Sequence, residues 1–203
     1  MSECTVEIKS ITVFCGATSG RLPEFEEAAY QLGKEIAEGG YELIYGGGSA
    51  GMMGAVANGT VDHGGKVTGV IPQFLVEREL AHQRLHKLEI VETMHERKAI
   101  MNDLGDAIIS LPGGAGTLEE FFEMYTWGQI GLHKKPLGLI NTRNFFDPLL
   151  TMFDKMISEE YLDEKYMKQL FIGKDFSSLI NQFENFEPVE VRTYKDLQKG
   201  HRS

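Results

Sequence analysis

The chain has 203 residues, 42% of them hydrophobic and 25% charged, which indicates a single soluble domain over residues 1–203 with a substantial core. Its net charge of −10 argues against nucleic acid as a partner, because a polyanion requires an extended basic surface. No apolar stretch reaches membrane-spanning length and the first residues lack a signal-peptide pattern, so we expect a cytoplasmic protein without membrane association.

Short apolar runs alternate with longer segments of helical period along the chain, which indicates an α/β fold with a doubly wound parallel sheet covered by helices on both faces. Strands are predicted at residues 10–15, 41–45, 66–71, 85–91, 107–111 and 137–141. Helices are predicted at residues 23–38, 51–63, 94–104, 117–132, 147–158 and 176–185. Residues 76–84 are expected to form a charged connection, and a polar tail begins at about residue 187.

Three glycine-rich turns follow predicted strands, at residues 16–20, 46–51 and 113–116. In an open parallel sheet, ligands bind at the carboxyl ends of the strands, so these turns are expected to converge on one site. Each turn alone is equally compatible with a tight strand-to-helix connection, and Thr18 and Ser19 fit either a helix cap or a ligand contact. The predicted ligand contacts in the first two turns are Gly16, Ser19, Gly47 and Gly48.

The third turn belongs to the most informative segment, PGGAGTLEE at residues 112–120, which ends an apolar run and opens a helix. A helix N-terminus presents unpaired backbone N–H groups and the positive end of its dipole, and glycines let an anion approach closely, so a phosphate site is expected. Glu119 and Glu120 follow directly and indicate chemistry beside that phosphate. The alternative is a capping box, in which Thr117 caps the helix and Glu120 bonds back to it.

A second polar cluster, MHERK at residues 94–98, lies one predicted helix and strand upstream. If Arg97 and Lys98 face the glycine turn, they supply the planar fork and the point charge that suit a phosphate. The alternative for both cations is a solvated helix face.

Other ligand classes are poorly supported. Residues 46–51 match G-x-G-x-x-G, but the next strand ends without the carboxylate that a dinucleotide site requires, and the kinase pattern G-x-x-x-x-G-K-[ST] is absent. The histidines show no H-E-x-x-H spacing, and His95 and His133 are interpreted as structural. Cys4 and Cys15 lack metal-site spacing and are expected to be reduced thiols. We predict neither a metal nor an organic cofactor.

The segments PGGAGTLEE and MHERK together resemble the motifs of the LONELY GUY family of phosphoribohydrolases. The resemblance runs from about residue 11 to about residue 170 and includes GGGSAGMMG at 46–54, Trp127 and HKKP at 133–136. It implies a Rossmann-like fold and a homodimer as the basic unit. It also implies hydrolysis of the N-glycosidic bond of cytokinin (N6-modified adenosine) 5′-monophosphates to a free base and ribose 5-phosphate.

The resemblance further implies roles for single residues. Arg97 and Glu120 match the two residues that the family treats as catalytic. The predicted nucleotide contacts in these motifs and their surroundings are Glu79, Met94, Lys98, Gly113, Gly114, Ala115, Gly116, Thr117, Leu118, Glu119 and Thr126. Glu79 also fits a solvated surface, because it lies in a charged run. Ala115 and the turn at residues 16–20 depart from common family sequences, which leaves the substrate preference open.

Cleavage of the ribosyl C1′–N bond builds positive charge on the ribose and negative charge on the departing base. We predict that Glu120 stabilises the ribosyl cation or polarises the attacking water, and that Arg97 complements the phosphate or the charge opposite Glu120. Phosphate binding at residues 114–117 would favour a nucleoside 5′-monophosphate over a nucleoside, with activity on AMP left open. The alternatives are a non-catalytic nucleotide or molybdenum-cofactor carrier and a dinucleotide oxidoreductase.

The predicted helix at residues 117–132 is apolar around most of its circumference, with Phe121, Phe122, Tyr125, Trp127 and Ile130. Such a helix needs partners on more than one side. Core packing alone would satisfy it, whereas the family resemblance implies a homodimer interface here, close to the base pocket, with higher assembly left open.

Overall fold

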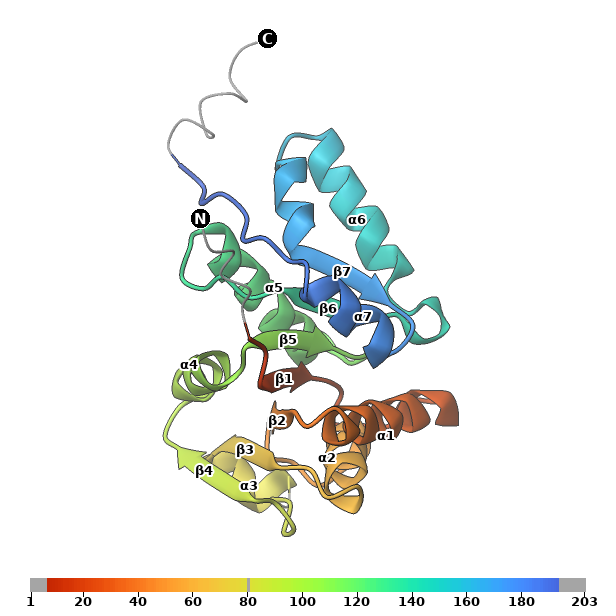
Figure 1. The fold of residues 1–203 in the computed structure, drawn as a ribbon. Coiled ribbons are helices and arrows are strands. Elements are labelled where there is room, and N and C mark those ends of the chain that lie inside the picture. Colours follow the sequence, from red (N-terminus) through yellow and green to blue (C-terminus); the bar gives the residue numbers. More distant parts are fainter. Residues whose placement is uncertain (1–6, 80, 194–203) are drawn as a thin grey trace.

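Seven parallel strands form one sheet in the computed structural model, which describes residues 7–79 and 81–193 (Figure 1). The strands are β1 (Ser10–Phe14), β2 (Glu42–Tyr45), β3 (Val67–Pro72), β4 (Lys87–Val91), β5 (Ala107–Ser110), β6 (Leu137–Ile140) and β7 (Leu170–Gly173). Their order is β4-β3-β2-β1-β5-β6-β7, so the chain winds outward from β1 in both directions. The predicted doubly wound, Rossmann-like α/β fold is confirmed.

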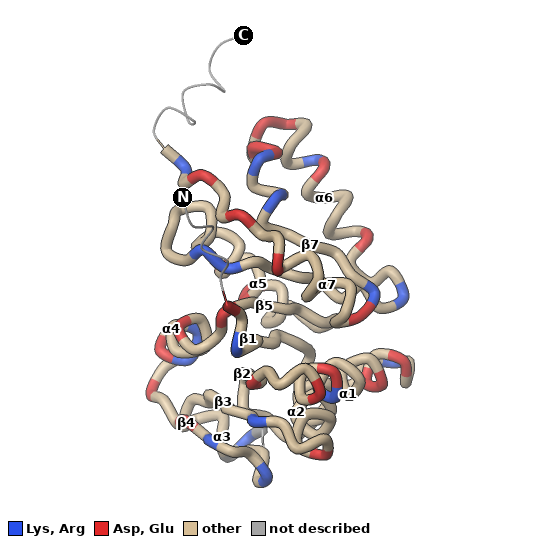
Figure 2. The backbone as a smooth tube through the Cα atoms, in the orientation of Figure 1, with Lys and Arg blue, Asp and Glu red and all other residues tan. Residues whose placement is uncertain are grey.

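Helices cover both faces of this sheet (Figure 1). They are α1 (Pro23–Glu38), α2 (Gly51–Asp62), α3 (Gln73–Glu79), α4 (Met94–Leu104), α5 (Ala115–Gln129), α6 (Asp147–Ser158) and α7 (Phe176–Phe183), with short 3-10 helices at Thr142–Asn144 and Glu164–Gln169. Both basic and acidic residues occur along α4 and α6 (Figure 2). Within residues 7–79 and 81–193, no helix combines the length and the apolar character needed to cross a membrane.

Two hydrophobic cores lie on opposite faces of the sheet. The first joins α1, α2 and α7 to the strands, and the second joins α4, α5 and α6 to the strands. The side chains of β1 point to both faces of the sheet in alternation. Ile11 and Val13 pack in the first core, and Phe14 packs in the second. A strand buried on both faces reads as a continuous apolar run, which explains why the central strands were predictable.

The predicted elements agree with the structure to within two residues at six strands and at most helices. Residues 73–79 form α3 where part of a charged connection was expected, and β7 was not predicted at all. Both elements are too short for periodicity to identify them, and β7 is a partly exposed edge strand. The polar tail is anchored where it is described, because Arg192 N donates to Gln129 O over 2.8 Å. Residues 194–203 of that tail, and Cys4, lie outside the described residues.

His133 is structural, as predicted from its sequence context. Its side chain is buried, Nε2 lies 2.7 Å from Met124 O, and Lys135 N donates to Nδ1 over 3.2 Å. The neutral tautomer with hydrogen on Nε2 satisfies both contacts. Burial, reinforced by the charge of Lys135, lowers the pKa of His133 in spite of the Met124 carbonyl.

Acidification is therefore expected to lower the free energy of unfolding. As the pH falls below about 6.5, the unfolded chain takes up a proton that folded His133 does not accept, at a cost of at most about 1.4 kcal/mol per pH unit. Urea unfolding at about pH 7.5 and about pH 5.5 measures this loss, which should be smaller in His133→Gln. Because burial also lowers the pKa of His82, some dependence should persist in the variant. Equal pH dependence in both proteins would contradict the assignment.

Candidate active site

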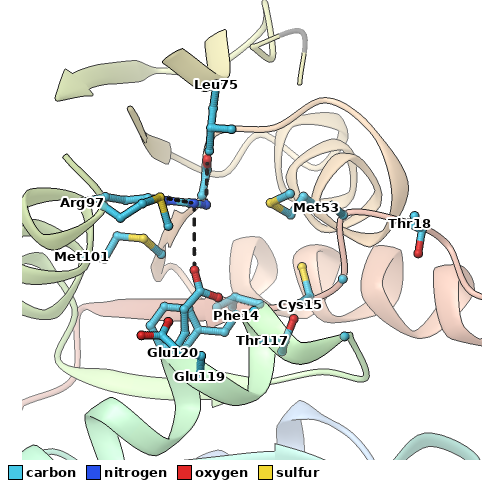
Figure 3. Close-up of a pocket in the computed structure, with 17 residues that line it drawn as sticks. Phe14, Cys15, Thr18, Met53, Leu75, Arg97, Met101, Thr117, Glu119 and Glu120 are labelled. Carbon is cyan, nitrogen blue, oxygen red and sulfur yellow. Dashed lines mark hydrogen bonds and ion pairs between the residues drawn. The ribbon is translucent and has the colours of Figure 1, made fainter. Parts of the chain in front are cut away.

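The loops after β1, β2 and β5 meet at a pocket of about 410 Å³ (Figure 3). The loops after β1 and β5 touch directly, since Gly16 N donates to Pro112 O over 3.2 Å. The lining residues are Val13, Phe14, Cys15, Gly16, Ala17, Thr18, Gly46, Met53, Leu75, Met94, Arg97, Met101, Gly114, Gly116, Thr117, Glu119 and Glu120. The three glycine turns thus converge as the sequence predicts.

The start of α5 presents free backbone donors to this pocket. Gly114 is the N-cap and makes no side-chain cap bond, and the first intrahelical bond runs from Leu118 N to Gly114 O over 3.2 Å. The N–H groups of residues 115–117 precede that bond and have no acceptor within the helix. Residues 114–116 are exposed, and a Cβ at Gly114 or Gly116 would meet nothing within 4 Å. An anion can therefore reach these donors.

The capping-box alternative for Thr117 and Glu120 is wrong. Helix α5 begins two residues earlier than predicted, so Thr117 is its third residue and cannot be the N-cap. The Thr117 hydroxyl lies against Gly113 instead. A Cβ added to Gly113 would lie only 2.2 Å from Thr117 Oγ1. Gly113 therefore leaves room for Thr117 to pack back against the turn, and Glu120 is not needed to cap the helix.

A capping box does occur at the start of α4. Glu96 N donates to Thr93 Oγ1 over 3.1 Å, and Thr93 N donates to Glu96 Oε2 over 3.3 Å. This start places Met94, Arg97 and Met101 at intervals of three and four residues, so that all three line the pocket.

Arg97 joins α4 to the loop after β2 and to α5 (Figure 3). Its side chain is only 7% exposed. Nη2 donates to Gly46 O over 3.2 Å, and Nη1 lies 3.8 Å from Met94 Sδ and 4.0 Å from Glu120 Oε1. The buried Nε has no hydrogen-bond partner in the structure. Because an unsatisfied buried donor is costly, a bound ligand that supplies an acceptor would be favoured here.

Glu120 faces Arg97 from α5, with a side chain 11% exposed. Close to both charges lies the Cys15 thiol, whose pKa is raised well above its ordinary range by burial and, to a smaller extent, by the charge of Glu120. The thiol is therefore protonated and is a poor nucleophile. This end of the pocket thus offers one carboxylate and one guanidinium group in a largely buried setting.

Gly46 leaves the space that Arg97 occupies, so Gly46→Ala is expected to lower kcat about 10- to 100-fold. The new Cβ would lie 1.9 Å from Arg97 Nη2 and 3.1 Å from its Cζ, which forces the guanidinium group away from its present position. Steady-state kinetics on the nucleotide expected from the sequence measures the effect, with urea unfolding as a control for the fold. A variant with unchanged kcat would show that the position of Arg97 is not important.

The structure brings about half of the predicted site residues to the pocket. Those that line it are Gly16, Met94, Arg97, Gly114, Gly116, Thr117, Glu119 and Glu120. Those that do not line it are Ser19, Gly47, Gly48, Lys98, Gly113, Ala115, Leu118 and Thr126. The side chain of Glu79, at the end of α3, lies outside the described parts of the chain.

Several of the residues outside the lining have other contacts. Gly47 O accepts from His82 N over 3.1 Å, and Gly48 bridges to Ala81, so this part of the turn holds the segment after α3. The Lys98 ammonium group is paired with carboxylates of α5. Thr126 is exposed on α5, about two turns beyond Glu119.

Thr18, which fitted either a helix cap or a ligand contact, lines the pocket. Sequence reasoning missed a set of mainly apolar lining residues: Val13, Phe14, Cys15, Ala17, Gly46, Met53, Leu75 and Met101. The helical spacing from Met94 through Arg97 was a usable signal for Met101. For Leu75 the sequence contains no such signal, because α3 itself was not predicted.

Among residues 7–79 and 81–193, no group of three or more His, Cys, Asp or Glu side chains is placed to hold a metal ion.

Comparison with known sequences identifies close relatives. A family model described as "Possible lysine decarboxylase" matches residues 53–183. The cytokinin riboside 5′-monophosphate phosphoribohydrolase LOG7 of Arabidopsis thaliana is 43% identical over 93% of this chain and 87% of its own length. The cytokinin riboside 5′-monophosphate phosphoribohydrolase of Rhodococcoides fascians is 44% identical over 85% of this chain and 87% of its own.

Solved structures with a similar fold are more distant in sequence. The molybdenum cofactor carrier protein of Chlamydomonas reinhardtii has a TM-score of 0.66 and 20% identity, covering 89% of this chain and 98% of its own. The molybdenum cofactor binding protein of Rippkaea orientalis has a TM-score of 0.65 and 22% identity, covering 88% and 97%. At such identities the likeness extends to the fold alone.

Proposed function

This chain belongs to the LONELY GUY family, and from that membership we propose that it hydrolyses the N-glycosidic bond of cytokinin riboside 5′-monophosphates, releasing the free base and ribose 5-phosphate. One observation carries the proposal. A single pocket combines the free N–H groups at the start of α5 with the buried Arg97 and Glu120 pair. The first suits a phosphate and the second suits a bond that breaks with separation of charge.

The 5′-phosphate is assigned to the start of α5. The N–H groups of residues 115–117 and the positive end of the helix dipole favour an anion at this place. The Thr117 side chain lines the pocket beside them, and Thr18 approaches from the loop after β1. Lys98 is not assigned to the phosphate, because its ammonium group is already bonded to Glu119 and Glu123.

Glu120 and Arg97 are assigned to the chemical step. As the C1′–N bond breaks, the Glu120 carboxylate stabilises the positive ribosyl centre or polarises the water that attacks it. Arg97 holds the opposite charge 4.0 Å away and offers its unpartnered Nε–H to an oxygen or nitrogen of the nucleotide. Preorganised charges of this kind are worth several kcal/mol in a buried site.

The purine base is assigned to the apolar wall of the pocket. This wall contains Phe14, Met53, Leu75, Met94 and Met101. Thioether side chains adapt to ligands of irregular shape and make favourable contacts with aromatic rings. Such a surface supports an N6-modified adenine with an apolar substituent over a plain adenine, so the modified nucleotide should have the lower KM.

Product analysis tests this function. Purified protein is incubated with N6-isopentenyladenosine monophosphate or AMP, and chromatography identifies the products. Free base and ribose 5-phosphate in equal amounts are expected. Nucleotide binding without cleavage would favour a non-catalytic carrier. The molybdenum-cofactor carrier structures share only the fold with this chain and do not by themselves support that function. Thermal stabilisation by NAD, without base release, would favour an oxidoreductase.

We also propose that the protein is a homodimer that acts in the cytoplasm. Phe121 and Tyr125 of α5 are buried in the second core, whereas Ile130 and Leu132 just beyond the helix are exposed, Leu132 to 63%. Exposed apolar side chains of this size suit a protein interface. Light scattering should give twice the mass of one chain at micromolar concentration. A monomer mass would refute the dimer.

A further inference from the structure

Lys98 forms a second set of charged contacts between α4 and α5. Its Nζ lies 2.6 Å from Glu119 Oε1 and 2.8 Å from Glu123 Oε2. The side chain of Lys98 is 6% exposed and that of Glu123 is 22% exposed, whereas that of Glu119 is 56% exposed. Lys98–Glu123 is therefore the less exposed of the two ion pairs, with Glu119 as an exposed second partner.

Lys98 keeps its charge in this position. Burial lowers the pKa of the ammonium group, but the hydrogen bonds and charges of Glu119 and Glu123 outweigh that effect and raise the pKa above its ordinary value. A buried ion pair adds little net stability, whereas removal of one partner leaves a costly unpaired charge. The Lys98–Glu123 pair is therefore better explained by the arrangement of α4 and α5 that it fixes than by the free energy of unfolding that it adds.

The Lys98–Glu123 pair joins the same two helices as the proposed catalytic pair. Arg97 directly precedes Lys98 on α4, and Glu120 lies about one turn before Glu123 on α5. The 4.0 Å between Arg97 Nη1 and Glu120 Oε1 is too long for a hydrogen bond, so this contact does not fix its own spacing. The shorter contacts at Lys98 limit how far α4 moves from α5.

We propose that Glu123 is a positioning residue, which holds Lys98 and thereby keeps Arg97 on α4 in register with Glu120 on α5. The inference rests on the proposed hydrolase function and gives Lys98 a role between two helices in place of a phosphate contact. Breaking the pair leaves the phosphate site at the start of α5 intact and misaligns the two charges. The chemical step is then slowed more than substrate binding is weakened.

Kinetics on N6-isopentenyladenosine monophosphate tests the proposal with Glu123→Gln, Lys98→Met and the double variant. Each single change is expected to lower kcat about 10- to 100-fold, because small misplacements of reacting groups are costly. KM should stay within about twofold of the wild-type value. The double variant should be no slower than either single one, since both remove the same pair. Glu159→Gln, which breaks an exposed pair with Lys155 on α6, is the matched control and should keep full activity.

A second measurement does not depend on turnover. In protein labelled with nitrogen-15 arginine, the Nε–H signal of Arg97 reports the surroundings of its guanidinium group. This signal should move in Glu123→Gln and in Lys98→Met, and should stay in place in Glu159→Gln. If Glu123→Gln does not fold, the double variant replaces it in both measurements, because it removes the buried ammonium group together with the Glu123 carboxylate.

Two results would overturn the proposal. One is a raised KM with unchanged kcat in Lys98→Met, together with normal kinetics in Glu123→Gln, which would make Lys98 a phosphate ligand. The other is an unmoved Arg97 signal in both variants. Failure of the wild-type protein to release base would refute the hydrolase function instead, and the Arg97 signal would still decide whether the ion pair positions Arg97.

Discussion

Glu120→Gln is expected to reduce base release at least roughly 1,000-fold while nucleotide binding is largely retained. The amide keeps the shape of the side chain, but it carries no charge to stabilise a ribosyl cation and is a poor base toward water. Any loss of stability reflects the lost charge pair with Arg97 and not a lost helix cap, because Glu120 does not cap α5. Single-turnover kinetics and calorimetric binding of AMP measure the two effects separately.

The matched control for this experiment is Glu27→Gln, which neutralises an exposed carboxylate on α1 and should behave as wild type. If Glu120→Gln kept its rate, whatever its change in stability, Glu120 would be a structural residue that pairs with Arg97. That result would remove the carboxylate from the proposed mechanism.

Arg97→Lys is expected to lower kcat about 100-fold although it preserves the charge. The guanidinium group spans the space between Gly46 O and the Glu120 carboxylate, and its Nε is a further buried donor. A lysine ammonium group is a point charge and cannot contact the Gly46 carbonyl and the Glu120 carboxylate while also supplying the donor that Nε provides. The pre-steady-state rate of base release, compared with wild type, measures the loss.

Arg143→Lys provides the control for that substitution. Arg143 forms an exposed ion pair with Glu24, in which Nη1 and Oε1 are 3.0 Å apart, and neither residue lines the pocket. It should retain the wild-type rate. If Arg97→Lys also retained it, a positive charge alone would suffice, and the directed contacts of the guanidinium group would have no part in catalysis.

The helices that carry the site illustrate how far the sequence predicts the structure. Two segments have the capping spacing T-x-x-E, one at Thr93 and one at Thr117, and only the first is a capping box. At the second, the glycine turn lets α5 begin at Ala115, with Gly114 as its N-cap. The T-x-x-E pattern is the same in both places, and the difference is that Gly113 has no Cβ, which leaves room for Thr117 to pack against the turn as the third residue of α5.

The charged residues show a second limit. Arg97 and Lys98 are adjacent in the sequence, and both were predicted to contact the nucleotide. On a helix, neighbouring residues point about 100° apart, so only Arg97 faces the pocket while Lys98 faces α5. Which of the two cations turns toward the ligand depends on the packing of α4 against the sheet. That packing is a tertiary property that spacing in one segment does not reveal.

The central claim is that phosphate binding at the start of α5 positions the ribose for attack between Arg97 and Glu120. The most direct test compares kcat/KM for base release from N6-isopentenyladenosine monophosphate and from the unphosphorylated nucleoside. We expect the monophosphate to be cleaved at least roughly 1,000-fold more efficiently, with part of the gain in kcat, because phosphate binding serves to orient the ribose. Equal efficiency on the two compounds would contradict the account.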